Sequence, residues 1–129
     1  VKATVESFFS DMQDRLAAAH LVIARAGAST VTELAVAGRP AILIPLGIAM
    51  DDHQTANAEG MVTGAAADVV PEPKFTAEML APLLVERISN AGVLKARARA
   101  SWQLGKPNAA RELADLAEQA AGVTGKRDA

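Results

Sequence analysis

Two uninterrupted apolar runs of strand length constrain the fold of this 129-residue chain more than any other feature. The first, HLVIAR, covers residues 20–25, and the second, PAILIPL, covers residues 40–46. A continuous apolar run, unlike an alternating one, is typical of a strand that is buried on both faces of a parallel sheet. A third, shorter run, ADVVP, covers residues 67–71. The chain is therefore expected to contain a parallel sheet.

Segments with helical patterns separate these runs. A helix is expected from about residue 31 to residue 37, closed by Gly38, and another begins at Asp51 or Asp52 and ends near Gly64. Before the first run, residues 3–9 have the composition of a short strand, and Ser10 or Asp11 is a candidate cap for a helix that continues to Ala19. This alternation predicts an α/β fold, a Rossmann-like parallel sheet with flanking helices.

The last third of the chain is expected to be helical. Helices are predicted over about residues 76–90, 92–104 and 108–121, followed by a polar tail at 122–129. With the strand and helix units of residues 1–75, they form one α/β unit, whose helical end packs on the sheet or on a neighbouring part of a longer protein. The chain does not begin with Met, and we expect it to be a piece of such a protein.

Composition excludes several kinds of site. The formal net charge is −2, which argues against a nucleic-acid partner, and three Phe and one Trp offer few stacking platforms for single strands. The sequence has no cysteine, so disulfides and thiolate metal sites are excluded. His20 and His53 lie far apart, without metal-ligand spacing, and His20 is expected to be structural. No apolar run reaches the roughly 20 residues that span a bilayer, and no signal peptide is expected.

A turn of small residues follows the first apolar run. Gly27, Ala28, Ser29 and Thr30 lead directly into a helical segment, where free N–H groups and the helix dipole favour a phosphate. Glycine permits conformations that other residues avoid, and the small side chains leave room for a bulky anion. The same residues also fit a capping box, with Thr30 as N-cap and Glu33 reaching back to its N–H. Both interpretations stay open at this point.

A second polar cluster follows the next apolar run. It comprises Asp51, Asp52, His53, Gln54 and Asn57, and its alternative interpretation is a solvated helix start. Because carboxyl ends of parallel strands meet at one edge of the sheet, both clusters are expected to face the same crevice. Arg25, at the end of the first run, is a candidate partner for a phosphate or for a carboxylate.

The stretches RAGASTVTELAVAGRPAILIP and DDHQTANA resemble the carboxyl-terminal half of the MurG family of glycosyltransferases, over about residues 5–120. The resemblance implies the carboxyl-terminal, donor-binding domain of a GT-B enzyme. Such enzymes transfer N-acetylglucosamine from UDP-N-acetylglucosamine, with inversion and without a metal or cofactor, to the lipid-linked muramyl-pentapeptide precursor of peptidoglycan. It also implies work at the cytoplasmic face of the bacterial inner membrane, as a peripheral protein.

Roles for several residues follow from the resemblance alone. The backbone of Phe9 would lie beside the uracil, the turn at residues 27–30 would contact the diphosphate, and Glu33 would accept hydrogen bonds from the ribose. His53 and Gln54 would form hydrogen bonds with the sugar hydroxyls, and Asn57 would support the loop that carries them. The apolar LGIAM stretch and the histidine at position 53 depart from the family pattern.

The family's glycine-rich loop, candidate base and acceptor site belong to an amino-terminal domain. No catalytic residue is therefore expected among these 129 residues. Two other interpretations stay open. One is a non-catalytic α/β fragment or engineered building block that self-associates through exposed sheet edges. The other is a GT-B enzyme that uses a different nucleotide sugar.

Overall fold

The computed structural model describes residues 2–46 and 53–122. Its centre is a sheet of three parallel strands in the order β1-β2-β3, made by β1 (Val22–Arg25), β2 (Ala41–Ile44) and β3 (Ala67–Val69). Val22 pairs with Ala41, which in turn pairs with Ala67, so the three strands start level. The predicted parallel sheet is confirmed.

Burial differs between the central strand and its neighbour. Every residue of β2 is buried, as its continuous apolar run predicts. In β1, by contrast, half-buried and exposed residues alternate, and Ile23 is 39% exposed. The prediction of burial on both faces is wrong for β1: alternate residues of a strand point to opposite faces, so the exposure of Ile23 and Arg25 shows that one face of β1 is not covered.

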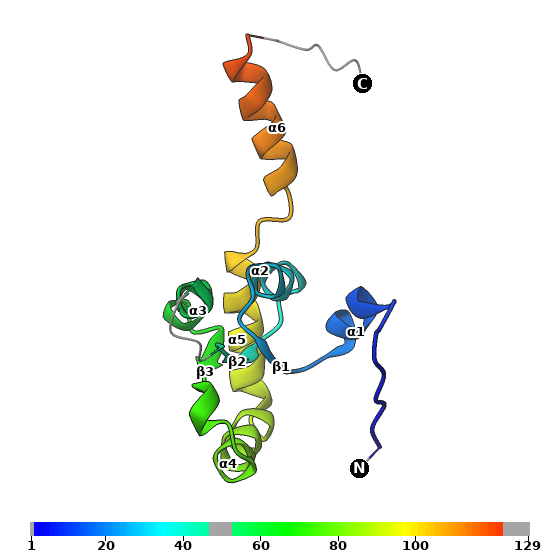
Figure 1. Ribbon diagram of the computed structural model, residues 1–129, viewed down its shortest axis with the longest axis vertical. Helices are drawn as coiled ribbons and strands as arrows, with labels where there is room; N and C mark the ends of the chain where they lie inside the picture. The colour runs from blue at the N-terminus through cyan, green and yellow to red at the C-terminus, as the bar shows by residue number, and fades with distance from the viewer. Residues whose placement is uncertain (1, 47–52, 123–129) are drawn as a thin grey trace.

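Helices α2 (Ala28–Ala37) and α3 (His53–Thr63) connect the strands, and α5 (Ala91–Leu104) runs between them (Figure 1). Leu34 of α2, Leu43 of β2 and Met61 of α3 meet in the core, where each is fully buried. Ser101 of α5 is also buried, and its hydroxyl donates to the carbonyl oxygen of Leu34 at 3.1 Å. This bond satisfies the buried hydroxyl and joins α5 to α2.

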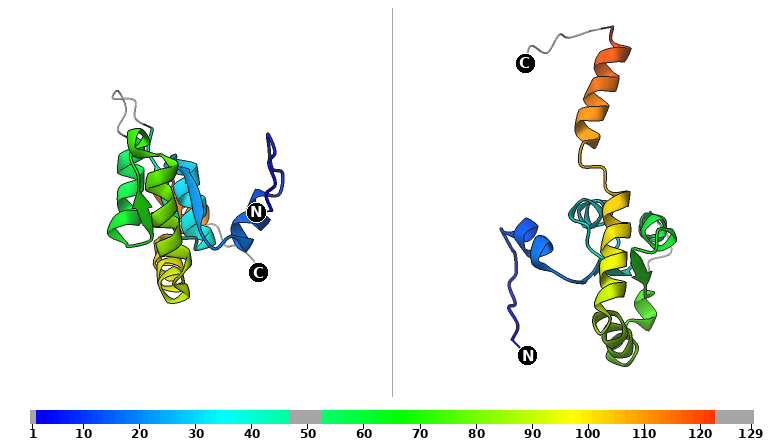
Figure 2. Two further views of the ribbon diagram at one scale, coloured as in Figure 1. Left: turned by 90° about the horizontal axis from the view of Figure 1, so that it is seen from below. Right: turned by 180° about the vertical axis from the view of Figure 1, so that it is seen from behind.

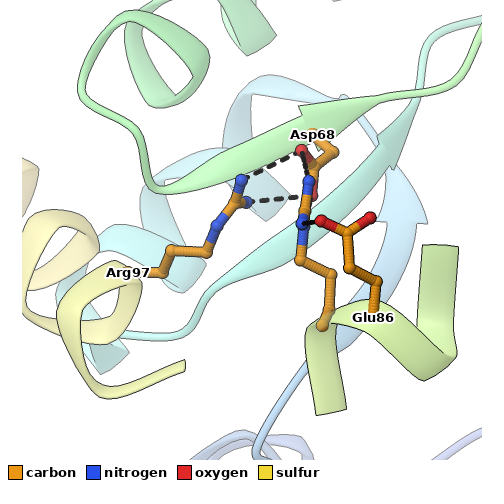
Figure 3. A network of polar contacts seen from close by, with 4 residues as sticks. Asp68, Glu86 and Arg97 are labelled. Carbon is orange, nitrogen blue, oxygen red and sulfur yellow. Dashed lines mark hydrogen bonds and ion pairs between the residues drawn. The ribbon is translucent and has the colours of Figure 1, made fainter. Parts of the chain in front are cut away.

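A network of ion pairs joins two helices to the sheet (Figure 3). Asp68 of β3 accepts hydrogen bonds from Arg87 of α4 (Ala77–Ile88) and from Arg97 of α5, at 2.8–3.0 Å. Each guanidinium donates to both carboxylate oxygens. The single carboxylate therefore ties both helices to β3.

The last helix, α6 (Ala109–Ala120), stands away from the rest of the molecule (Figures 1 and 2). Its side chains are exposed, and Leu113 and Leu116 show 68% and 62% of their surface to solvent. The three predicted helices after residue 76 are confirmed in their order and approximate bounds. The sequence leaves two places for these helices, the sheet or another part of a longer protein. Arg87 and Arg97 join two of them to Asp68 of β3, whereas α6 projects from the rest of the molecule.

The region before β1 differs from expectation. Residues 3–9 form no strand, so that prediction is wrong, and α1 (Met12–Ala18) packs beside α2. Asp11 occupies the N-cap position of α1, but its side chain makes no capping bond, because its carboxylate pairs with Arg15 at 2.8 Å. The predicted caps of α3, Asp51 and Asp52, lie outside the described residues, and α3 ends next to Gly64 as expected.

Candidate functional site

The turn between β1 and α2 begins the helix earlier than predicted. Gly27 is the N-cap, with φ −64° and ψ 150°, and the N–H of Val31 donates to its carbonyl oxygen at 3.0 Å. Thr30 therefore lies inside the first turn, and the predicted capping box, with Thr30 as N-cap, is wrong. The reason is local: the extended Gly27 allows Ala28 to be the first helical residue.

The N-cap residue of α2 is a glycine, which has no side chain that could bond the first N–H groups of the helix. No side chain of the described residues caps the N–H groups of α2, so they stay available to another acceptor. The φ of Gly27 is one that any residue adopts, so this position does not require glycine's special freedom. A Cβ there would be 3.7 Å from Thr30 Oγ1, an ordinary contact. The consequence of glycine here is that the N-cap position, at the positive end of α2, carries no side chain.

Asn57 of α3 connects the second cluster to this turn. Its Nδ2 donates to the carbonyl oxygen of Ala26 at 3.1 Å, and Ala26 is fully buried. The bond crosses from α3 to the residue immediately before Gly27. It brings one member of the second cluster to the turn at the carboxyl edge of the sheet, while Asp51 and Asp52 of that cluster lie outside the described residues.

Gln54 and His53 occupy the first turn of α3. Gln54 Oε1 accepts a hydrogen bond from the N–H of Leu46 at 3.0 Å, which ties the start of α3 to the chain after β2. The amide NH2 group of Gln54 remains for other contacts. His53, the first residue of α3, is exposed.

Arg25 forms an ion pair with Glu72, a residue of the short 3₁₀ helix η1 (Glu72–Lys74). Of the two partners that the sequence left open for Arg25, the structure shows a carboxylate. Glu72 was not among the predicted site residues. It follows β3, so the rule that polar groups gather beyond the carboxyl ends of parallel strands could have identified it.

Glu33 lies on the side of α2 that faces α1. Glu33 is exposed and lines a groove of about 700 Å³ between α1 and α2, together with Met12 and Thr32. Phe9 is half-buried, and the guanidinium of Arg15 lies 4.0 Å from the centre of its ring. His20 is exposed beside Pro40 at the opposite end of β1 and β2 from the turn.

Within residues 2–46 and 53–122, no group of three or more His, Asp or Glu side chains is placed to hold a metal ion. Each helix in the same ranges is too short or too polar to cross a bilayer.

Comparison with known proteins decides the family of this fold and site. Residues 1–119 match the family model described as the glycosyltransferase family 28 C-terminal domain. The chain belongs to this family. The likeness confirms the expected fold class, the parallel-sheet carboxyl-terminal domain of a GT-B glycosyltransferase.

Two similar proteins have the same enzyme name. A UDP-N-acetylglucosamine--N-acetylmuramyl-(pentapeptide) pyrophosphoryl-undecaprenol N-acetylglucosamine transferase from Rhodospirillum centenum is 50% identical over 123 residues, 95% of this chain and 32% of that protein. The enzyme of the same name from Maricaulis maris is 53% identical over 114 residues, 88% of this chain and 31% of that protein. The domain thus spans about a third of the length of these relatives.

A solved structure agrees with the sequence relatives. The crystal structure of Acinetobacter baumannii MurG superposes with a TM-score of 0.83 at 40% identity, covering 90% of this chain and 33% of that one. The predicted resemblance to MurG is confirmed.

Proposed function

We propose that this domain supplies part of the donor site of a transferase for UDP-N-acetylglucosamine. The observation that carries the proposal is the start of α2, which no side chain of the described residues caps and which Asn57 holds from α3. Helix N-termini at the carboxyl edge of a parallel sheet favour phosphate groups. The identity of the sugar nucleotide in this proposal comes from the names of the relatives.

The diphosphate of the donor is assigned to the turn. The backbone N–H groups of Gly27, Ala28 and Ser29 and the hydroxyl of Thr30 are the proposed donors, since they lie at the N-terminus of α2. Arg25, two residues before Gly27, adds a positive charge at the same edge. Oxygen atoms of phosphate accept hydrogen bonds from all of these groups.

The nucleoside is assigned to the α1 side of α2. Glu33 is not part of a capping box, because Gly27 is the N-cap, so its carboxylate is available to accept bonds from ribose hydroxyls. The exposed position of Glu33 in the groove between α1 and α2 supports this role. The backbone of Phe9, which precedes α1, is assigned to the uracil.

The sugar is assigned to the start of α3. His53 and the NH2 group of Gln54 are the polar groups that read its hydroxyls, while Gln54 Oε1 keeps the end of β2 and α3 together. Asn57 serves by holding the turn rather than by reading the sugar.

The rest of the proposed reaction lies outside these residues. The acceptor is the lipid-linked muramyl-pentapeptide, held with the catalytic base by another part of a longer protein, with inversion and without a resident metal or cofactor. Such an enzyme works at the cytoplasmic face of the inner membrane, in peptidoglycan synthesis and hence in cell shape and division. Self-association through the edge strands β1 and β3 stays a prediction.

A chimera tests the proposal. The 123 matched residues of the Rhodospirillum centenum relative are replaced by those of this chain, and sugar transfer to the lipid-linked acceptor is measured. We expect transfer from UDP-N-acetylglucosamine. Preference for another UDP-sugar would favour the alternative of a related GT-B enzyme. A folded but inactive chimera would favour the non-catalytic alternative.

A further inference from the structure

The ion pair between Arg25 and Glu72 joins two segments on either side of the central strand. Arg25 is the last residue of β1, and Glu72 begins η1 after β3. Because β2 lies between β1 and β3, the pair spans the carboxyl edge of the sheet. Each side chain keeps contact with solvent, since Arg25 is 47% exposed and Glu72 is 40% exposed. Ion pairs between exposed side chains contribute little free energy, so another anion can compete for either partner.

Arg25 also lies close in the chain to the proposed diphosphate position. Arg25 is two residues from Gly27, and two residues of extended chain span at most about 7 Å. A diphosphate on the α2 N-terminus would carry more negative charge than a carboxylate, and a guanidinium binds phosphate through two parallel hydrogen bonds. The carboxylate of Glu72 would repel the same ligand. Arg25 therefore has two competing anionic partners.

We infer that Glu72 is an internal competitor of the donor diphosphate for Arg25. In the free protein the Glu72 carboxylate neutralises Arg25, and on binding the diphosphate displaces it. Glu72 thereby weakens the affinity for the nucleotide and favours release of the product UDP. This inference rests on the proposed function and adds a residue that tunes donor affinity to it.

Calorimetric titration of the 129-residue chain with UDP tests the inference. Glu72→Gln removes the charge and keeps the size of the side chain, and we expect UDP to bind roughly two- to fivefold more tightly, the factor to which an exposed ion pair corresponds. Glu86→Gln is the matched control, because Glu86 also pairs with an arginine, Arg87, but lies on α4. It should leave the affinity unchanged.

A double-mutant cycle shows whether the effect acts through Arg25. In an Arg25→Gln background, Glu72→Gln should tighten binding by a smaller factor, because the competition is gone. Equal or weaker binding of UDP to the single variant Glu72→Gln would overturn the inference, since a carboxylate that only positions Arg25 for the ligand gives that result. An equal gain in both backgrounds would also overturn it.

The outcomes separate the inference from the function on which it rests. Saturable binding of UDP to the unmodified chain with no gain in Glu72→Gln refutes the inference and leaves the donor site standing. Absence of UDP binding to the unmodified chain and to Glu72→Gln, with both proteins folded by circular dichroism, refutes the two together.

Discussion

Asn57 Nδ2 donates a hydrogen bond to the carbonyl oxygen of Ala26 at 3.1 Å, joining α3 to the turn that begins α2. Ala26 is fully buried, so its carbonyl depends on protein groups for a partner. The asparagine thus connects two polar clusters that lie about thirty residues apart in the sequence.

Replacing Asn57 tests this connection. Asn57→Asp exchanges the NH2 donor for an oxygen that faces the Ala26 carbonyl, so we expect a loss of about 1–3 kcal/mol in the free energy of unfolding, the cost of an unsatisfied buried acceptor. Urea denaturation measures it, with Thr55→Ala, an exposed position of the same helix, as control. Equal stability of the two variants would show that the bond does not hold the turn.

A substitution at Gly27 should affect ligand binding without lowering the stability of the fold. Its ordinary φ accepts any residue, and Gly27→Asp would supply α2 with a capping carboxylate. We expect stability to be kept or to rise by a few tenths of a kcal/mol. UDP binding should fall at least roughly tenfold, because the carboxylate occupies and repels the proposed phosphate position. Calorimetry and urea denaturation measure the two effects. Undiminished UDP affinity in a folded variant would remove the diphosphate from this turn.

Glu33→Ala distinguishes a ribose contact from a structural role. Since Glu33 is exposed and is not part of a cap, the variant should keep its stability within about 0.5 kcal/mol. The affinity for UDP should fall by about 1–3 kcal/mol, the range for losing hydrogen bonds to a charged group. Glu59→Ala, on the exposed surface of α3, is the control. The assignment fails if stability drops while affinity stays the same.

Asp68 gives the fold a dependence on pH. Burial by itself raises the pKa of the Asp68 carboxyl, but hydrogen bonds from Arg87 and Arg97 outweigh burial and hold the pKa below its usual value. The hydrogen bond to Asp68 likewise raises the pKa of Arg87, so both partners stay charged. A lowered pKa in the folded state adds stability above the unfolded pKa of about 4, and this stability is lost as the pH falls through the folded value.

We therefore expect Asp68→Asn to lower the free energy of unfolding at pH 7 by about 1–3 kcal/mol, because two guanidinium groups lose their shared carboxylate. The difference between the variant and the unmodified chain should shrink as the pH is lowered below about 4. Urea denaturation across this range measures it. A difference that stays constant with pH would exclude the carboxylate charge as its source.

Much of the sheet could be predicted because its determinants are local. The apolar run at residues 40–46 is long enough to indicate a buried strand, and β2 is buried at every residue. The start of α2 differs from the prediction: Thr30 and Glu33 have the spacing of a capping box, which predicts a helix from about residue 31, whereas α2 begins at Ala28. The dihedral angles of Gly27 decide where the helix starts, and the spacing of Thr30 and Glu33 does not indicate them.

The partners of the charged groups depend on the assembled fold. Arg25 and Glu72 lie 47 positions apart and meet only because β1 and β3 end at the same edge. Arg87 and Arg97 lie on two different helices, and nothing in the sequence around either one indicates Asp68. Topology alone brings these groups together.

A ¹H–¹⁵N NMR titration of the chain with UDP-N-acetylglucosamine, compared with UMP, tests the central claim most directly. The account predicts that both ligands shift the backbone amide signals of residues 27–33. The signals of His53 and Gln54 should move only with the complete sugar nucleotide. A well-dispersed spectrum in which neither group of signals moves, or in which shifts occur only elsewhere, would contradict a donor site at this edge of the sheet.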